Sequence, residues 1–201
     1  IRADSTASLA STLLLAEIAE RIDAGGVTQQ EEAFFRVAVN LNKLQTSVLS
    51  HEAVNRGIEV LGGNGAIESF SVLPRLLRDN VVYENWEGSH NVLRAQVLRD
   101  CLRLGVQEGF VAEIRERLGP AHGPALAGDA QELQELLSLP DAQRDLRFRR
   151  LSARMATWVM VAALQPIAEL RAARTMTLRH LDAPAIDEDY LQAVKDLQRL
   201  P

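Results

Sequence analysis

The sequence contains one cysteine, nine aromatic residues and no long apolar segment within its 201 residues. The lone thiol, Cys101, excludes an intramolecular disulfide framework and suits a reducing compartment such as the cytoplasm. No apolar run approaches the roughly 20 residues that a membrane span needs, and no signal peptide is visible. Because aromatic side chains are scarce while apolar residues make up 47% of the chain, we expect an aliphatic globular core.

Several functional classes also lack their signatures. The net charge of -5 argues against a nucleic-acid surface by bulk charge. None of the four histidines pairs with another His, Cys or Glu at a known metal-motif spacing, so we expect no metal site. A G-x-S-x-G nucleophile motif is absent. The run Gly62-Gly63-Asn64-Gly65 lacks the G-K-[ST] ending of a P-loop and by itself is typical of a helix end and turn.

One long helix, from about residue 29 to residue 61, dominates the pattern. Thr28 and Glu31 have the spacing of a capping box, in which each side chain accepts a hydrogen bond from the other residue's backbone N–H. Gly57 weakens the helix, but no proline interrupts it. Apolar residues recur every three or four positions and predict one buried stripe: Phe34, Val37, Leu41, Leu44, Val48, Val54, Ile58 and Leu61.

The other segments are also predicted to be helical. Asp4 or Ser5 is expected to cap a first helix that ends at Gly25, with Leu9 and Leu13 on its apolar face. No segment has strand periodicity, so the fold class is all-α, an antiparallel helical bundle with short loops. The further expected segments are a short helical piece at 73–78, helices at 90–104 and 106–118, a linker at 121–128, a short helix near 129–139, a long helix from 141 kinked at Pro166, and a final helix near 187–199.

Four landmarks occur in register over about sixty residues. Lys43 lies 19 residues before Gly62 in the long helix. The run Glu59-Val60-Leu61-Gly62-Gly63-Asn64-Gly65 precedes Arg75-Leu76-Leu77-Arg78-Asp79, and Trp86-Glu87-Gly88-Ser89 follows, with Glu87 eight residues after Asp79. Together they resemble the Q-I-x-G-G-x-G, R-x-x-R-D and Y-E-G-T motifs in the C-terminal domain of the acyl-CoA dehydrogenase flavoproteins. The variants at Glu59, Trp86 and Asn91 look closest to the AidB-like branch of that family.

This resemblance implies FAD as cofactor and an acyl-CoA thioester as substrate, oxidised to the 2,3-enoyl-CoA. In the family a carboxylate removes a proton beside the thioester while a hydride leaves the next carbon for the flavin. The base must therefore be dry enough for its pKa to rise toward working pH. Glu87 stands at the position of this base, beside the apolar wall of Trp86. The alternative is an acid near a helix N-terminus, favoured by the helix dipole, and Glu84 is expected to be solvent-facing or structural.

The flavin contacts follow from the same resemblance. Gly62, Gly63 and Gly65 match the turn whose backbone meets the pyrophosphate end of FAD, often across a subunit boundary, where a side chain would push the dinucleotide away. Ser89 and Asn91 match polar positions at the start of the next helix, whose free N–H groups suit FAD's polar parts. Glu59 replaces the family's Gln and is not included as a contact.

Two neighbouring groups are given structural or solvent-facing roles. Arg75, Arg78 and Asp79 are expected to form a structural ion-pair cluster rather than a catalytic one. His90, in the first turn of its helix, is expected to face solvent.

The chain is expected to have two parts. Residues 1–104 correspond to the family's helical bundle, and residues 105–201 to a helical extension packed on it. Because no initiator Met is present and the family's preceding domains are missing, we interpret the chain as a fragment that alone binds FAD poorly and is inactive. The implied partners are acyl-CoA, the missing N-terminal domains, a homo-oligomer (dimer or tetramer) and an electron acceptor such as an electron-transfer flavoprotein.

Two other functions remain open. One is an AidB-like, DNA-associated flavoprotein with little dehydrogenase activity, and the other is a non-catalytic helical oligomerisation module. A local group of arginines bears on the first, since it is either a phosphate or nucleic-acid contact or a solvated helix face balanced by nearby acids. Its members are Arg144, Arg147, Arg149, Arg150 and Arg154.

Overall fold

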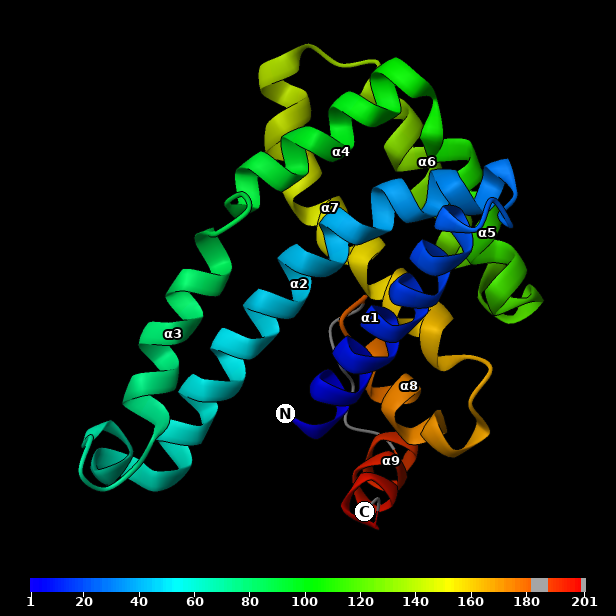
Figure 1. Ribbon diagram of the computed structural model, residues 1–201. Helices are drawn as coiled ribbons and strands as arrows, with labels where there is room; N and C mark the ends of the chain where they lie inside the picture. Colours follow the sequence, from blue (N-terminus) through cyan, green and yellow to red (C-terminus); the bar gives the residue numbers. More distant parts are fainter. Residues whose placement is uncertain (182–187, 200–201) are drawn as a thin grey trace.

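The computed structural model describes residues 1–181 and 188–199, and within them all regular structure is helical (Figure 1), which confirms the all-α fold class. Three short 3-10 turns, η1 (Gly62–Ala66), η2 (Pro120–His122) and η3 (Ala168–Leu170), join longer helices. The helices are α1 (Arg2–Asp23), α2 (Gln29–Leu61), α3 (Leu73–Asn85), α4 (His90–Leu104), α5 (Val106–Leu118), α6 (Gly123–Leu137), α7 (Asp141–Leu164), α8 (Arg171–Leu178) and α9 (Glu188–Arg199).

The long helix α2 begins and ends where the sequence predicts. Its capping box is complete: the Glu31 amide donates to Thr28 Oγ1 at 3.1 Å, and the Thr28 amide donates to Glu31 Oε2 at 3.0 Å. Gly57 has a packing reason, because a Cβ there would come within 3.2 Å of the Leu73 side chain. The glycine thus lets α3 start close against α2.

A continuous aliphatic core joins the predicted bundle and the predicted extension. One buried cluster takes side chains from α1, α2, α4, α5, α6 and α7, and within it Phe34 of α2 stacks on Phe110 of α5 at 5.8 Å between ring centroids. Gly109 lets the two helices approach, since a Cβ there would lie 2.7 Å from Ala33 Cβ. Helix α7 buries Leu151, Met155 and Trp158 in this core, and Trp158 is only 1% exposed.

The second half of α2 and the whole of α3 form a two-helix arm that extends from the remaining helices (Figure 1). Along this arm the predicted stripe of α2 becomes more exposed, and Leu61 is 42% exposed. Several other apolar residues of the arm also face outward, including Val60, Phe70, Val82 and Trp86. The arm therefore carries apolar surface that the rest of the described chain does not cover.

The structure corrects the expected first helix. Helix α1 begins at Arg2, so neither Asp4 nor Ser5 is its cap. Leu9 and Leu13 are 61% and 60% exposed, because α1 instead packs its Ala7 and Ile18 side against the bundle.

Two further expectations are wrong. Residues 121–128 are not a linker, because Gly123–Leu137 form α6, with a proline in the first turn where its missing N–H does no harm. Pro166 does not kink a continuing helix, since α7 ends at Leu164 and a separate α8 follows. In the described residues no helix is both long and apolar enough to cross a bilayer.

Candidate functional site

The loop between α3 and α4 places Glu87 in an unusual backbone conformation. Glu87 has φ 55°, and it is the one non-glycine residue with a positive φ among the described residues. Gly88 follows with φ 114°. A left-handed conformation costs an L-residue about 1–2 kcal/mol, and such strain gathers at functional sites. The surrounding structure must therefore hold the loop in place.

Lys43 of α2 supplies this support. Its Nζ donates to the Gly88 carbonyl at 2.7 Å and to the Glu84 carbonyl at 3.2 Å. Burial lowers the pKa of Lys43, while Glu87 and Glu84 oppose that shift by stabilising the charged form. The lysine predicted as a family landmark thus connects the long helix to both sides of Glu87.

A polar seam continues between α2 and α3. His51 Nδ1 lies 2.8 Å from Glu84 Oε1, and Asn80 Nδ2 donates to the same oxygen at 3.0 Å. His90 is half-buried rather than solvent-facing, with Nε2 3.3 Å from Ser47 Oγ, which corrects the expectation for this residue. Of the two alternatives for Glu84, the structure favours the structural one.

The Glu87 side chain itself is exposed in the described chain. The water-poor cleft that the resemblance implies for a general base is therefore not formed by these residues. Trp86, the expected apolar wall, is also 57% exposed.

Ser89 and Asn91 line a groove of about 860 Å³ where α2, α3, α4 and α7 meet. The sequence paired these two residues, and the structure adds His90 and Arg94 beside them on α4. Ser89 is the N-cap residue of α4, yet its side chain makes no capping hydrogen bond. We call this the α2–α4–α7 groove; its lining residues are Leu44, Gln45, Val48, Glu52, Glu84, Asn85, Ser89, His90, Asn91, Arg94, Arg149, Arg150 and Ala153.

The glycine-rich turn lies at the other end of α3. That helix has 13 residues, so about 20 Å of helix separates Gly62, Gly63 and Gly65 from Glu87. The structure therefore divides the predicted site residues into two groups. The first contains Glu87, Ser89 and Asn91, and the second contains the three glycines.

Different constraints favour glycine at the three positions of this turn. Gly62 ends α2 with φ 60°, in the left-handed region. Gly65 is buried, and a Cβ there would lie 2.7 Å from the Ile58 carbonyl oxygen. A Cβ at Gly63 would meet no atom of the chain within 4 Å. Internal packing therefore explains Gly65, and backbone conformation explains Gly62, but neither explains Gly63.

The R-x-x-R-D motif forms exposed ion pairs on α3. Arg75 Nε lies 3.7 Å from Asp79 Oδ2, as the cluster interpretation expects. Arg78 instead pairs with Glu68, which lies before the helix. Glu59, the departure from the family's Gln, is exposed.

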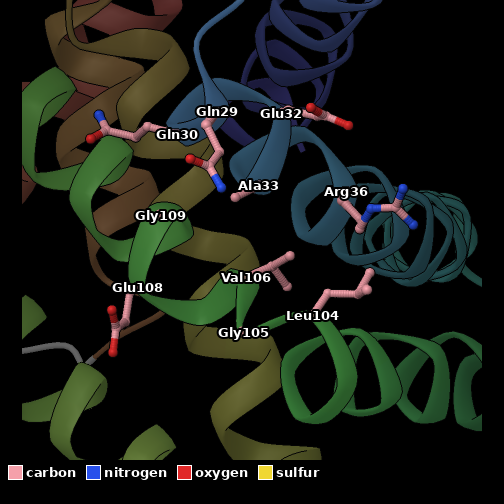
Figure 2. Close-up of a pocket in the computed structure, with 10 residues that line it drawn as sticks. All are labelled: Gln29, Gln30, Glu32, Ala33, Arg36, Leu104, Gly105, Val106, Glu108 and Gly109. Atoms are coloured by element: carbon pink, nitrogen blue, oxygen red, sulfur yellow. The ribbon is translucent and has the colours of Figure 1, made fainter.

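A second groove, of about 490 Å³, lies where α2 begins and α4 turns into α5 (Figure 2). Its charged lining residues are Glu32, Arg36 and Glu108, and Figure 2 shows Glu32 and Glu108 on opposite sides of it. None of the predicted site residues reaches this groove.

Other chemistry finds little support. In the described part of the chain no three His, Cys, Asp or Glu side chains gather as metal ligands. Burial raises the pKa of the Cys101 thiol to about 12, and the side chain packs in the core. It therefore stays a neutral core residue.

Comparisons with known proteins agree with the motifs. Residues 4–102 match the sequence model of the acyl-CoA dehydrogenase C-terminal domain. A stretch of 92 residues, 44% of the chain, is 39% identical to "Acyl-CoA dehydrogenase family member 11" of Caenorhabditis elegans and spans 15% of that protein. The AidB-like branch is not confirmed by these matches and stays a prediction.

Two solved structures share the fold. The apo form of Bd2924 superposes with a TM-score of 0.70 at 25% identity, over 81% of this chain and 31% of that one. Caenorhabditis elegans ACDH-11, solved in complex with C11-CoA, gives 0.73 at 22% identity, over 98% of this chain and 38% of that one. The chain thus spans well under half the length of each relative.

Proposed function

We propose that this chain is the C-terminal part of an FAD-dependent acyl-CoA dehydrogenase with Glu87 as its general base, because residues 4–102 match the acyl-CoA dehydrogenase C-terminal domain and carry its motifs. The observation that carries the proposal is the left-handed backbone of Glu87, held by the hydrogen bond from Lys43 to Gly88. Strain at a motif residue, supported from a neighbouring helix, is typical of a positioned functional group.

Glu87 takes the proton in this mechanism. With an acyl-CoA beside the loop, its carboxylate removes the proton from the carbon next to the thioester carbonyl, and the C–H electron pair forms the new double bond. FAD supplies the acceptor for the hydride that leaves the adjacent carbon. Because Glu87 is exposed here, the wall that dries the carboxylate and raises its affinity for a proton must come from outside these residues. The preceding domains of the whole protein are the proposed source.

FAD fits the glycine turn on one structural ground. Gly63 has neither the φ nor the crowding that would require glycine, and the space above it is open. A dinucleotide lying on the turn supplies the missing reason, because a side chain there would displace it. The turn lies about 20 Å from Glu87 along α3, and the resemblance implies that such a turn often meets its flavin across a subunit boundary.

The exposed apolar surface of the arm also indicates a covering partner. Val60 is 83% exposed, Phe70 58% and Trp86 57%, a set that a protein in water would bury. The missing N-terminal domains and a second copy in a dimer or tetramer are the occupants that the dehydrogenase architecture provides. An electron-transfer flavoprotein is the proposed electron acceptor.

The test is Glu87→Gln in the complete protein, followed by anaerobic mixing with acyl-CoA. The amide is too weak a base to remove the substrate proton, so substrate-driven bleaching of the flavin should slow by about two to four orders of magnitude, with FAD still bound. Unchanged bleaching would remove Glu87 as the base. Absent bleaching in the unmodified protein would instead favour a DNA-associated or purely structural role. The matched control is Glu68→Gln, an exposed carboxylate outside the loop.

A further inference from the structure

Three arginines converge on the α2–α4–α7 groove without acidic partners. Arg94 comes from α4, and Arg149 and Arg150 come from α7, which lies outside the segment that matches the family. In the described residues no carboxylate lies within ion-pair distance of these three guanidinium groups. Of the other members of the arginine group, Arg144 pairs with Asp141, and Arg154 pairs with Asp129 at 2.7 Å.

The position of Arg94 is fixed by the extension. Its Nε donates to Ser152 Oγ at 3.1 Å, and its Nη1 donates to Asn91 Oδ1 at 3.2 Å. Ser152 is fully buried and donates in turn to the Arg149 carbonyl at 2.9 Å. The guanidinium of Arg149 is close enough that it adds to burial in lowering the pKa of Arg94. Two like charges therefore line the same groove.

The two acids that line the same groove do not neutralise the arginines. Glu52 accepts from Arg56 at 2.9 Å, and Glu84 is engaged by His51 and Asn80. The groove also receives the N-terminus of α4, a 15-residue helix whose N-cap side chain leaves its amides uncapped. Guanidinium groups and helix N-terminal amides both favour phosphate oxygens.

We propose that the α2–α4–α7 groove binds the phosphate groups of an adenine nucleotide, with Arg94, Arg149 and Arg150 as the cationic ligands. The choice of a nucleotide rests on the proposed function, because acyl-CoA and FAD both carry an adenosine 5′-diphosphate. A duplex nucleic acid fits less well, since the carboxylates of Glu52 and Glu84 line the α2 and α3 sides of the groove and the chain is acidic.

The experiment titrates the 201-residue chain by calorimetry with three probes: 3′-phospho-ADP, which represents the CoA end, ADP, which represents the FAD end, and uncharged adenosine. We expect the phosphorylated probes to bind, more weakly as salt rises, and adenosine not to bind. Tighter binding of 3′-phospho-ADP assigns the groove to acyl-CoA, and equal binding assigns the shared diphosphate. Backbone amide NMR shifts should centre on His90, Asn91 and Arg94.

Paired variants test the assignment. Arg149→Gln with Arg150→Gln should weaken binding by about tenfold or more. The control, Arg103→Gln with Arg147→Gln, removes the same charge from exposed positions outside the groove and should change affinity less than twofold. Equal losses in both variants, binding of adenosine, or no binding at millimolar concentrations would overturn the proposal. The proposal would also be overturned if duplex DNA bound more tightly than the nucleotides and the groove variant lost that binding. This titration does not measure flavin bleaching, so its outcome does not depend on whether Glu87 is the general base.

Discussion

The ammonium group of Lys43 donates a 2.7 Å hydrogen bond to the carbonyl of Gly88, a residue 45 positions later in the chain. This contact fixes the C-terminal side of Glu87, and the second bond from Lys43 to Glu84 fixes the N-terminal side. The left-handed backbone of Glu87 therefore depends on one cation of α2. Lys43 is a positioning residue in the proposed chemistry.

Replacement of Lys43 by Met should loosen this loop. We expect a loss of about 1–3 kcal/mol in the free energy of unfolding, because two carbonyls lose a charged donor. In the complete protein the rate of flavin reduction should fall about tenfold or more while KM changes little. Stopped-flow reduction and denaturant titration measure the two effects. Arg36→Met, at an exposed site on the same helix, is the control, and equal rates in both variants would contradict the positioning role.

The glycine turn predicts opposite results for two similar substitutions. Gly65→Ala should cost about 2–3 kcal/mol, because the new methyl group would press on the Ile58 backbone. Gly63→Ala should leave stability within about 0.5 kcal/mol, since its methyl group meets open space, yet it should weaken FAD binding in the complete protein. Thermal melts and flavin titration separate the effects. Full FAD affinity in Gly63→Ala would argue against a dinucleotide on this turn.

The capping box of α2 gives a pH-dependent prediction. The hydrogen bond from the Thr28 backbone lowers the pKa of Glu31, and Arg21, 2.7 Å away, adds to the shift. A lowered folded-state pKa stabilises the fold above the ordinary value of 4.5, and this stabilisation is lost as the pH falls through the folded-state value.

Glu31→Gln should therefore destabilise the chain by about 1 kcal/mol at neutral pH. The difference from the unmodified chain should shrink in acid, and urea titrations across the pH range measure it. Glu32→Gln, exposed on the same turn, is the control. A difference that is constant down to the most acidic pH would show that the cap does not depend on the carboxylate charge.

The isolated chain should lack dehydrogenase activity. Glu87 is exposed and no described element closes a cleft over it, so neither the flavin ring nor the substrate is enclosed. After incubation with FAD and gel filtration, the protein should be colourless, and acyl-CoA should not reduce an artificial electron acceptor. A yellow fraction with turnover would contradict this prediction.

The sequence by itself determined the all-α class, the bounds of α2 and the motifs. The bounds of α2 and its capping box follow from local rules, since apolar periodicity and the Thr28–Glu31 spacing act within a few residues. The motif spacing indicated the acyl-CoA dehydrogenase C-terminal domain, whose sequence model matches residues 4–102, without any contact being known. Local rules failed at Leu9, which belongs to an apolar pattern but faces outward, because the face that α1 buries depends on its neighbours.

Only the tertiary structure decided how the site is assembled. Three features of the site join residues more than 40 positions apart: Lys43 bonds to Gly88, His90 contacts Ser47, and Arg94 lines the same groove as Arg149. Such contacts depend on how whole helices pack, and helix packing is set by the shapes of many buried side chains together. No spacing within a single segment of the sequence carries that information.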